Sequence, residues 1–194
     1  MTNPREHHLY QNPKSELRLS VSPASAGWRY LSFSALTLLA GSSHTHATEN
    51  TEVAIVPLSG EGTVTAGNQS FTLRRENVFA GKPDVLYIPP KHEIKVEATS
   101  DFEFALGGAP AEGKYPLRLF QPEEMRSEMR GGGTALRQVN HILAAPLPAE
   151  RLILFEVYVP GGTWSGWPPH CHDGYEGSPY LEEVYYYRFT PTYG

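Results

Sequence analysis

The chain has 194 residues, of which 40% are hydrophobic, and this is enough to bury at least one hydrophobic core. Only 19% of the residues are charged and the formal net charge is −5, so no nucleic-acid partner is expected. The single cysteine, Cys171, excludes an intramolecular disulfide framework and suits a reducing compartment.

The first 27 residues are polar and lack the apolar core of a signal peptide, so residues 1–27 are predicted to be an N-terminal extension of a cytoplasmic protein. The apolar stretch 30–41 that follows is too short to cross a bilayer, and no membrane partner is expected. We interpret this stretch as a strand. Its expected core positions include Leu31, Phe33, Ala35 and Leu39.

Segments with β-branched runs or strict alternation follow, and residues 28–112 are predicted to form one β-barrel. Gly67 and Asn68 supply the residues that a tight hairpin turn needs. The best candidate for a helix, residues 121–129, begins with a proline and two acids. It lies in a predicted linker, residues 113–135, whose glycine run lacks the lysine and the strand-to-helix frame of a phosphate-binding loop.

The two halves of the chain echo one another. Each runs from a strand through a glycine turn, a His-x-His pair and a polar loop to a glutamate and a second strand. The repeated residues, at offsets of 126 for the histidines and 131 for the glutamates, are His44, His46 and Glu52 in the first half and His170, His172 and Glu183 in the second. A repeat of this size indicates a duplicated domain, so residues 136–194 are predicted to form a second barrel.

The second His-x-His pair has the spacing of a metal site. Because alternate residues of a strand share a face, His170 and His172 are predicted to point to one side, and Cys171 to the other as a buried or inert thiol. Glu183 follows after a ten-residue connection, which is long enough to reverse the chain and bring its carboxylate to the imidazoles. Two histidines and one glutamate suit a divalent cation with an open coordination position. The alternative is a pair of surface histidines in a loop rich in proline and glycine.

The side chains around this motif are predicted to have structural rather than catalytic roles. Glu182 is expected to face away from Glu183, in a solvated or ion-paired position. The aromatic side chains are expected to pack or to wall a pocket rather than to act in catalysis. These are Trp164, Trp167, Tyr185, Tyr186 and Tyr187.

The stretch PGGTWSGWPPHCHD, residues 160–173, is followed by YLEEVYYYRF, residues 180–189. Together with GGGTALRQVNHIL and LSGEGTV upstream, they resemble the signature of the 5-deoxy-glucuronate isomerases, which are bicupin enzymes of myo-inositol catabolism. The resemblance covers most of the chain after about residue 28 and implies an all-β fold of two tandem cupin barrels. It also implies a cytoplasmic enzyme that converts 5-deoxy-glucuronate, a small sugar acid, into 2-deoxy-5-keto-gluconate by aldose–ketose isomerisation.

The resemblance further implies roles for individual residues. By match to the family motif, His170, His172 and Glu183 are the metal ligands, with zinc as the first expectation and manganese or iron as alternatives. Arg188 is a candidate partner for the substrate carboxylate, with an ordinary surface charge as the alternative. The sequence does not identify the catalytic base, and a homo-oligomer is compatible with the resemblance.

The first barrel is expected to carry no catalytic metal, because the resemblance places the site in the second barrel. His44 and His46 are followed by a loop that offers two glutamates, Glu49 and Glu52. His92 lacks the spacing of the later cupin motif.

The sequence departs from the cupin pattern near its end. Cupin sites take a further histidine from a later strand, whereas no histidine follows His172 and Gly194 comes eleven residues after Glu183. The strand pattern of the first half continues for 57 residues after Glu52, so the second barrel is expected to be partial, short by roughly 46 residues. Weak metal binding and weak isomerase activity are expected in consequence. Two alternatives stay open, namely a metal-dependent cupin oxygenase and a non-catalytic cupin that binds sugar acids.

Overall fold

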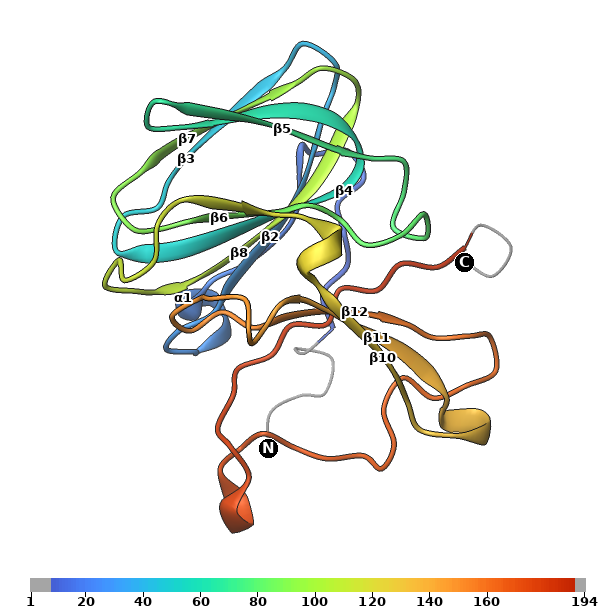
Figure 1. Cartoon of the computed structure of the whole chain (residues 1–194). Coiled ribbons are helices and arrows are strands. Elements are labelled where there is room, and N and C mark those ends of the chain that lie inside the picture. Colours follow the sequence, from blue (N-terminus) through green and yellow to red (C-terminus); the bar gives the residue numbers. More distant parts are fainter. Residues whose placement is uncertain (1–7, 191–194) are drawn as a thin grey trace.

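The structure, a computed structural model, describes residues 8–190, and most of its elements are β-strands, with a few single helical turns (Figure 1). The ends of the predicted N-terminal extension and of the predicted second barrel, residues 1–7 and 191–194, lie outside the described residues. The all-β prediction is confirmed. No helix in the described part of the chain is long and apolar enough to cross a membrane.

The chain forms a larger first half and a smaller second half. The strands of the first half are β1 (Leu17–Val21), β2 (Ser32–Leu38), β3 (Ser43–Ala47), β4 (Thr51–Ala66), β5 (Gln69–Arg75), β6 (Val85–Ile88), β7 (Glu93–Ala98), β8 (Phe102–Pro110) and β9 (Arg118–Phe120). The strands of the second half are β10 (Arg126–Arg130), β11 (Arg137–Leu143) and β12 (Leu154–Tyr158). The helical turns are α1 (Pro23–Ala26), η2 (Pro122–Glu124), η3 (Gly133–Ala135) and η4 (Tyr175–Gly177).

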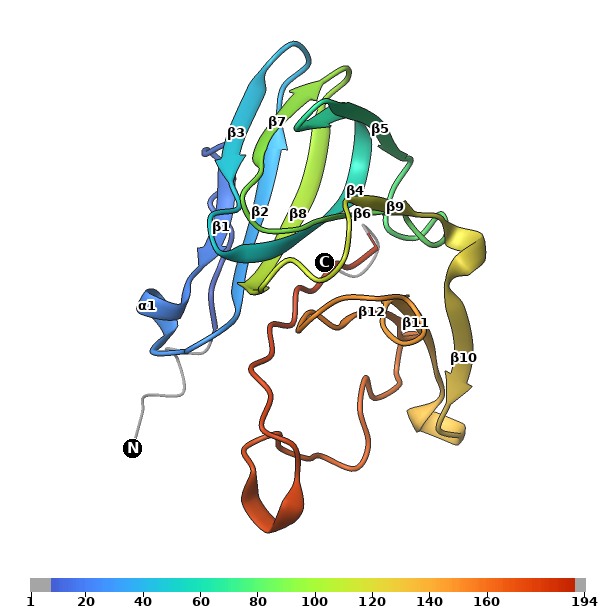
Figure 2. The same ribbon diagram turned by 60° about the vertical axis from the view of Figure 1, so that its left-hand side comes forward.

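Strand β4 joins the two β-layers of the first half (Figure 2). Its first part pairs with β8 and β6, in a sheet with the order β1-β2-β8-β4-β6-β9, and its second part pairs with β5 and β7. The two parts meet at Gly60, whose φ of +83° favours glycine, and a Cβ atom there would lie 1.8 Å from the carbonyl oxygen of Asp101. The predicted hairpin at Gly67 and Asn68 is confirmed, because Ala66 pairs with Gln69 across it.

Alternate residues of β4 face two different cores. Val53 and Ile55 belong to the core between the layers of the first half. Ala54 and Val56 point the other way, into a second core that also contains Leu152 of the second half. The two-residue period of the strand therefore packs the second half against the outer surface of the first.

Strand β2 differs from its prediction by one residue in register. Leu36 and Leu38 enter the first core, whereas Leu39 comes after the end of the strand and is 64% exposed. Ala35 is buried as predicted, and Leu31 packs on the second core. A shift of one residue exchanges the two faces of a strand, which explains why Leu36 and Leu38 are in the core and Leu39 is not.

The predicted segment boundaries also move. Part of the expected N-terminal extension is strand β1, which pairs with β2. The expected helix over 121–129 is reduced to the single turn η2, and the chain becomes strand β10 at Arg126. The glycine run of the predicted linker lies in the turn between β10 and β11, so it connects two strands of the second half.

The second half contains the three-stranded sheet β10-β11-β12 and then a long segment that returns along the first half (Figures 1 and 2). Among the described residues after Tyr158, the β-pairing consists of one isolated bridge, between Asp173 and Tyr180. The second half is thus a sheet with one open face, in agreement with the prediction of a partial second barrel.

Candidate metal site in the second half

A hairpin brings the two sides of the candidate metal site together. The carbonyl oxygen of His172 accepts a hydrogen bond from the backbone of Leu181 at 2.9 Å, next to the bridge between Asp173 and Tyr180. The Asp173 carboxylate accepts hydrogen bonds from the backbone N–H of Tyr175 and from a serine hydroxyl, and these bonds lower the pKa of Asp173. The predicted reversal of the chain between the histidines and Glu183 is therefore present, and the Asp173 carboxylate stabilises it.

The structure brings the expected ligands close to one another. His172 Nε2 lies 3.8 Å from Glu183 Oε1, and the ring centroids of His170 and His172 are 5.1 Å apart. Within residues 8–190, however, no three His, Cys, Asp or Glu side chains converge closely enough to hold an ion as they stand. Of the expected ligands, His172 and Glu183 thus come nearest to sharing an ion, with His170 beside His172.

The chemistry of the donor set fits a divalent cation. His170 Nδ1 lies 2.9 Å from the carbonyl oxygen of Pro168, and a carbonyl accepts only, so Nδ1 carries the proton and Nε2 keeps its lone pair. Nδ1 of His172 is buried and has no hydrogen-bond partner. The nitrogen that approaches Glu183 is Nε2, so an ion held between His172 and Glu183 would leave Nδ1 to be satisfied by another group or by water. Cys171 between them is exposed rather than buried.

Glu182 faces away from Glu183, as predicted, but its partners are backbone groups. Its two carboxylate oxygens accept hydrogen bonds from the N–H groups of Arg29, Tyr30 and Leu31 at 2.7–2.9 Å. Burial raises the pKa of Glu182, yet these three hydrogen bonds outweigh it and leave the pKa below its ordinary value. This carboxylate therefore fixes the segment beside Glu183 to the chain just before β2.

Glu52 makes the reciprocal contact from the first half. It is fully buried, and its carboxylate accepts hydrogen bonds from the N–H groups of Glu150, Arg151 and Leu152 at 2.6–2.8 Å. These residues precede β12 as the partners of Glu182 precede β2, and the two sets of partners differ by 121 residues. The hydroxyl of Tyr87 completes the site around Glu52.

This symmetry corrects one part of the internal repeat. Glu52 corresponds to Glu182, at an offset of 130 residues, and not to Glu183. The counterpart of Glu183 is then Val53, which is buried in the first core. The sequence-based comparison chose the wrong glutamate because both members of the Glu-Glu pair fit the spacing, and only the backbone contacts distinguish them.

The first half keeps the two histidines without this carboxylate. His44 and His46 lie opposite Val96 and Ile94 of β7, which are core residues, so both imidazoles point inward. Burial lowers the pKa of His44 and of His46 below the ordinary value. His92 lies at the rim, where its Nδ1 contacts the carbonyl oxygen of a proline.

The segment after Glu183 has two distinct faces. Tyr185 and Tyr187 are exposed and stack with a centroid distance of 6.1 Å. Tyr186 points to the first half and packs against Phe33. Arg188 points the same way as Tyr186 and donates a hydrogen bond to Glu103 of β8, so the structure gives it an ion-pair partner on the first half. The two tryptophans, Trp164 and Trp167, are exposed and pack against each other.

Charged residues on β10 and β11 were not singled out from the sequence. Arg126, Glu128 and Arg130 recur at every second position. Arg126 and Glu128 contact His141 on the neighbouring strand, and Arg130 binds Glu128. Their two-residue period is the sequence signal that could have identified them. It was missed because the stretch 121–129 was predicted to be a helix.

Comparisons with known proteins agree with this architecture. The profile of the KduI/IolB family matches residues 5–194. A 5-deoxy-glucuronate isomerase of Geobacillus thermodenitrificans is 36% identical over 179 residues, an alignment that covers 90% of this chain and 65% of the relative. One from Bacillus subtilis strain 168 is 34% identical over 200 residues, with 100% and 73% covered.

A solved structure matches the fold over most of its length. The IolB-like protein of Salmonella typhimurium LT2 has a TM-score of 0.81 and 34% sequence identity, over 85% of this chain and 64% of that one. The chain thus spans 65% of the length of the Geobacillus relative and 64% of the Salmonella protein. Since the family profile matches nearly every residue and these relatives share both sequence and fold with it, the chain belongs to the KduI/IolB family.

Proposed function

We propose that this chain is a metal-dependent isomerase that converts 5-deoxy-glucuronate into 2-deoxy-5-keto-gluconate. The observation that carries the proposal is the approach of His172 to Glu183 at 3.8 Å, beside His170, in a chain whose relatives are named 5-deoxy-glucuronate isomerase. The expected location is the cytoplasm, and the expected partner is a small sugar acid.

His170, His172 and Glu183 would hold the divalent cation, with zinc as the first expectation and manganese or iron as alternatives. A bound cation of this kind supplies charge stabilisation for the oxygen atoms of the substrate during aldose–ketose isomerisation. The protein contributes the orientation of the donors. The carbonyl oxygen of Pro168 fixes the tautomer of His170, and the contacts of Glu182 hold the neighbouring carboxylate in place.

The reaction also needs a group that moves a proton between adjacent carbons. Tyr185 lies on the same face of the segment as Glu183, two residues further on. The partial removal of Tyr185 from water, and then the charge of Glu183, raise the pKa of Tyr185, so its hydroxyl stays protonated at neutral pH. Tyr185 is therefore suited to donate a hydrogen bond to a substrate oxygen and unsuited to act as the base.

The test combines metal content with turnover. The protein is loaded with zinc, manganese or iron(II), dialysed, and assayed for loss of 5-deoxy-glucuronate, with Glu183→Gln and Glu182→Gln as a matched pair. We expect Glu183→Gln to lose both metal and turnover, and Glu182→Gln to retain more of each. Retention of metal and turnover in Glu183→Gln would contradict the proposal. Oxygen uptake by the iron-loaded protein would point to the oxygenase alternative, and binding of the sugar acid without turnover would point to a non-catalytic cupin.

A further inference from the structure

A cluster of charged side chains on β10 and β11 lies outside the candidate metal site. It consists of Arg126, Glu128, Arg130 and His141, which contact one another. We propose that this cluster, with Arg126 at its centre, binds the carboxylate group of the sugar-acid substrate. The inference deepens the proposed function and rests on it for the identity of the ligand.

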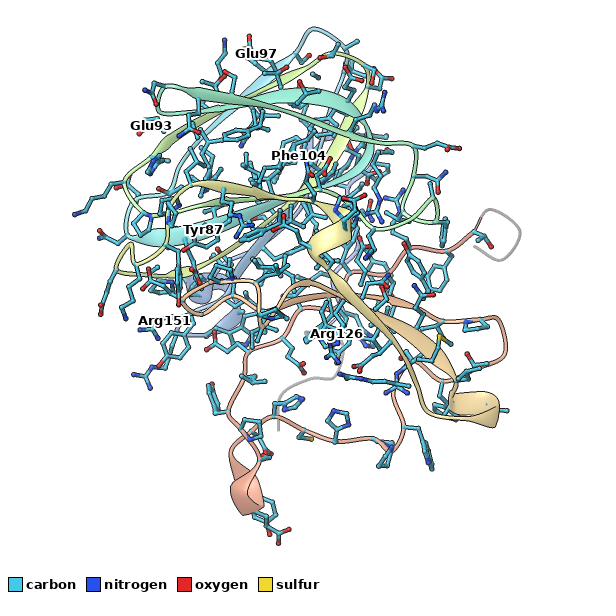
Figure 3. The ribbon with its side chains drawn as sticks, in the orientation of Figure 1. Tyr87, Glu93, Glu97, Phe104, Arg126 and Arg151 are labelled. Carbon is cyan, nitrogen blue, oxygen red and sulfur yellow. The ribbon has the colours of Figure 1, made fainter. Side chains whose placement is uncertain are left out.

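The cluster faces away from the first half. Arg126 pairs in register with His141, which in turn pairs with Phe155 on β12. The next position of β12 has the opposite orientation, because Glu156 binds Arg75 of the first half. Phe155, by contrast, is exposed, and Figure 3 shows Arg126 on the side of the sheet that is turned away from the first half.

The correspondence between the halves places this face on the inner side of the second barrel. The pairing of Ser20 with Ser34 across β1 and β2 recurs, at the offset of 121 residues, as the pairing of His141 with Phe155. The strand face that includes Ser34 continues two residues later with Leu36, which lies in the first core. The face of β12 that carries Phe155 is therefore the inner face of its own half.

Glu183 occupies an inner position by the same correspondence. Its counterpart Val53 also lies in the first core. The Arg126 cluster and Glu183 thus face the same interior of the second half, because their counterparts on β2 and β4 belong to one sheet of the first half and point into one core. A sugar acid whose reacting carbons lie at the metal ligands would direct its carboxylate across this interior toward the cluster.

The cluster carries more positive than negative charge. Glu128 Oε2 accepts a hydrogen bond from Arg126 Nη1 at 2.9 Å, and Glu128 Oε1 accepts one from Arg130 Nε at 2.6 Å. Arg137 lies directly opposite Arg130 in the register of β10 and β11, which adds a third guanidinium group. Three guanidinium groups on one face with one carboxylate leave an excess of positive charge, which favours an anion.

The position of His141 limits the hydrogen bonds that Arg126 can make within the cluster. His141 is buried, and its Nε2 lies 2.8 Å from Arg126 Nη2 and 2.9 Å from Glu128 Oε1. One ring nitrogen cannot accept from the first group and donate to the second at the same time. When His141 Nε2 donates to Glu128, the acceptor that remains for Arg126 Nη2 is the more distant Nδ1 of the same ring, at 3.3 Å. A substrate carboxylate would replace this long contact with a bidentate pairing to the planar guanidinium.

Arg188, the residue proposed from the sequence, is less suited to this role. Its guanidinium is already bound to Glu103, whose side chain is largely buried, on the outer surface of the first half. Arg188 therefore provides a matched control for Arg126, since both are arginines with an acidic neighbour and only Arg126 lies on the inner face.

The experiment compares Arg126→Met, Arg126→Lys and Arg188→Met in the metal-loaded protein. Binding is measured by calorimetry with D-glucuronate and with D-glucose, which lacks the carboxylate, and KM and kcat are measured with 5-deoxy-glucuronate. For Arg126→Met we expect the Kd for D-glucuronate and the KM to rise about 10-fold or more, with metal content unchanged. Arg126→Lys should lie between Arg126→Met and the parent protein, because a lysine keeps the charge but not the bidentate fork. Arg188→Met should bind like the parent protein.

Other outcomes decide against one proposal or the other. Parent-like Kd and KM in Arg126→Met would overturn this inference while leaving the isomerase proposal intact. Binding of D-glucuronate that depends on Arg126, without any turnover, would support the inference and refute the isomerase proposal. No preference of the parent protein for D-glucuronate over D-glucose would overturn the inference. If Arg126→Met does not fold, Arg126→Lys decides. Parent-like binding of D-glucuronate by Arg126→Lys would overturn the inference, and so would an equal loss of binding in Arg126→Lys and Arg188→Met.

Discussion

Glu182 and Glu183 are neighbours with the same side chain, yet they lie in opposite environments. The extended backbone turns Glu182 toward three N–H groups of the first half, whereas Glu183 faces the open side of the second half. A carboxylate that receives three hydrogen bonds from the backbone is held in one position. At the scale of a single residue, Glu182 therefore serves positioning and Glu183 is free for binding.

Substitution by alanine is expected to separate the two roles. Glu182→Ala leaves three N–H groups without their acceptor, so the free energy of unfolding should fall by about 1–3 kcal/mol. Glu183→Ala removes an exposed side chain and should change that free energy by less than about 0.5 kcal/mol while reducing metal retention. Urea unfolding and metal analysis of both variants check this, with Glu97→Ala as an exposed control. Equal stability loss in the two variants would contradict the assignment.

The half-buried histidines of the first half, His44 and His46, predict a loss of stability in mild acid. Burial lowers the pKa of His44 and of His46 in the folded chain, while Glu16 and Glu93 partly oppose this effect. Below pH of about 6.5 the unfolded chain binds more protons than the folded one, so stability decreases as the pH falls through this range and is full above it.

Unfolding by urea at pH 7.5 and at pH 5.5 measures this loss. The double variant His44→Gln/His46→Gln should show a smaller difference between the two pH values than the parent protein. An equal difference in both proteins would show that other groups cause the acid sensitivity.

Several of these features were predictable from the sequence, and the reasons for the failures are physical. The His-x-His pair and the spacing to Glu183 predicted the approach of His172 to the carboxylate. For the stretch 121–129, however, a proline and two acids indicated a helix. These residues form only the single turn η2, and the helix does not continue beyond it. The charges at Arg126 and Glu128 then follow the two-residue period of a strand, and their cross-strand contacts on β11 determined the outcome. Contacts between the halves, such as those of Glu52, involve residues about 100 positions apart and have no local signal.

At the scale of elements, β4 is the strand on which the first half depends. It contributes to both layers and to both cores, and the change from one layer to the other takes place at Gly60. A positive φ and the close approach of a backbone carbonyl both restrict this position to glycine.

Gly60→Ala is therefore expected to be strongly destabilising. The added Cβ atom would lie 1.8 Å from the carbonyl oxygen of Asp101, and this backbone atom can move only if β4 and β8 separate. The loss should exceed about 1 kcal/mol, the effect of an ordinary glycine-to-alanine change. Gly161→Ala provides the control, because no atom lies within 4 Å of its added Cβ. Thermal unfolding of both variants makes the comparison, and similar melting temperatures would rule out a special role for Gly60.

At the scale of the whole molecule, the two halves are joined by reciprocal contacts rather than by a flexible linker. Glu52 binds the chain before β12, and Glu182 binds the chain before β2. The second core contains residues of both halves. An ion pair between Arg75 and Glu156 adds a third connection, with two hydrogen bonds of 2.7 and 2.8 Å. The open inner face of the second half is therefore held on the rigid first half.

This arrangement predicts that the halves unfold together and that the ion pair couples them. Arg75 is buried and also donates to the carbonyl oxygens of Pro57 and Gly81, so Arg75→Met leaves the carboxylate of Glu156 without its partner inside the interface. Loss of one member of a buried pair costs about 3–5 kcal/mol, and Arg75→Met should lower the free energy of unfolding by an amount of this order. Glu156→Gln should cost less, because the guanidinium keeps its carbonyl partners. The double variant Arg75→Met/Glu156→Gln should recover part of the loss, with a coupling energy of about 0.5–3 kcal/mol.

Urea unfolding followed by circular dichroism and by tryptophan fluorescence should give coincident transitions in the parent protein. Separate transitions there, or additive effects in the double variant, would show that the two halves are independent.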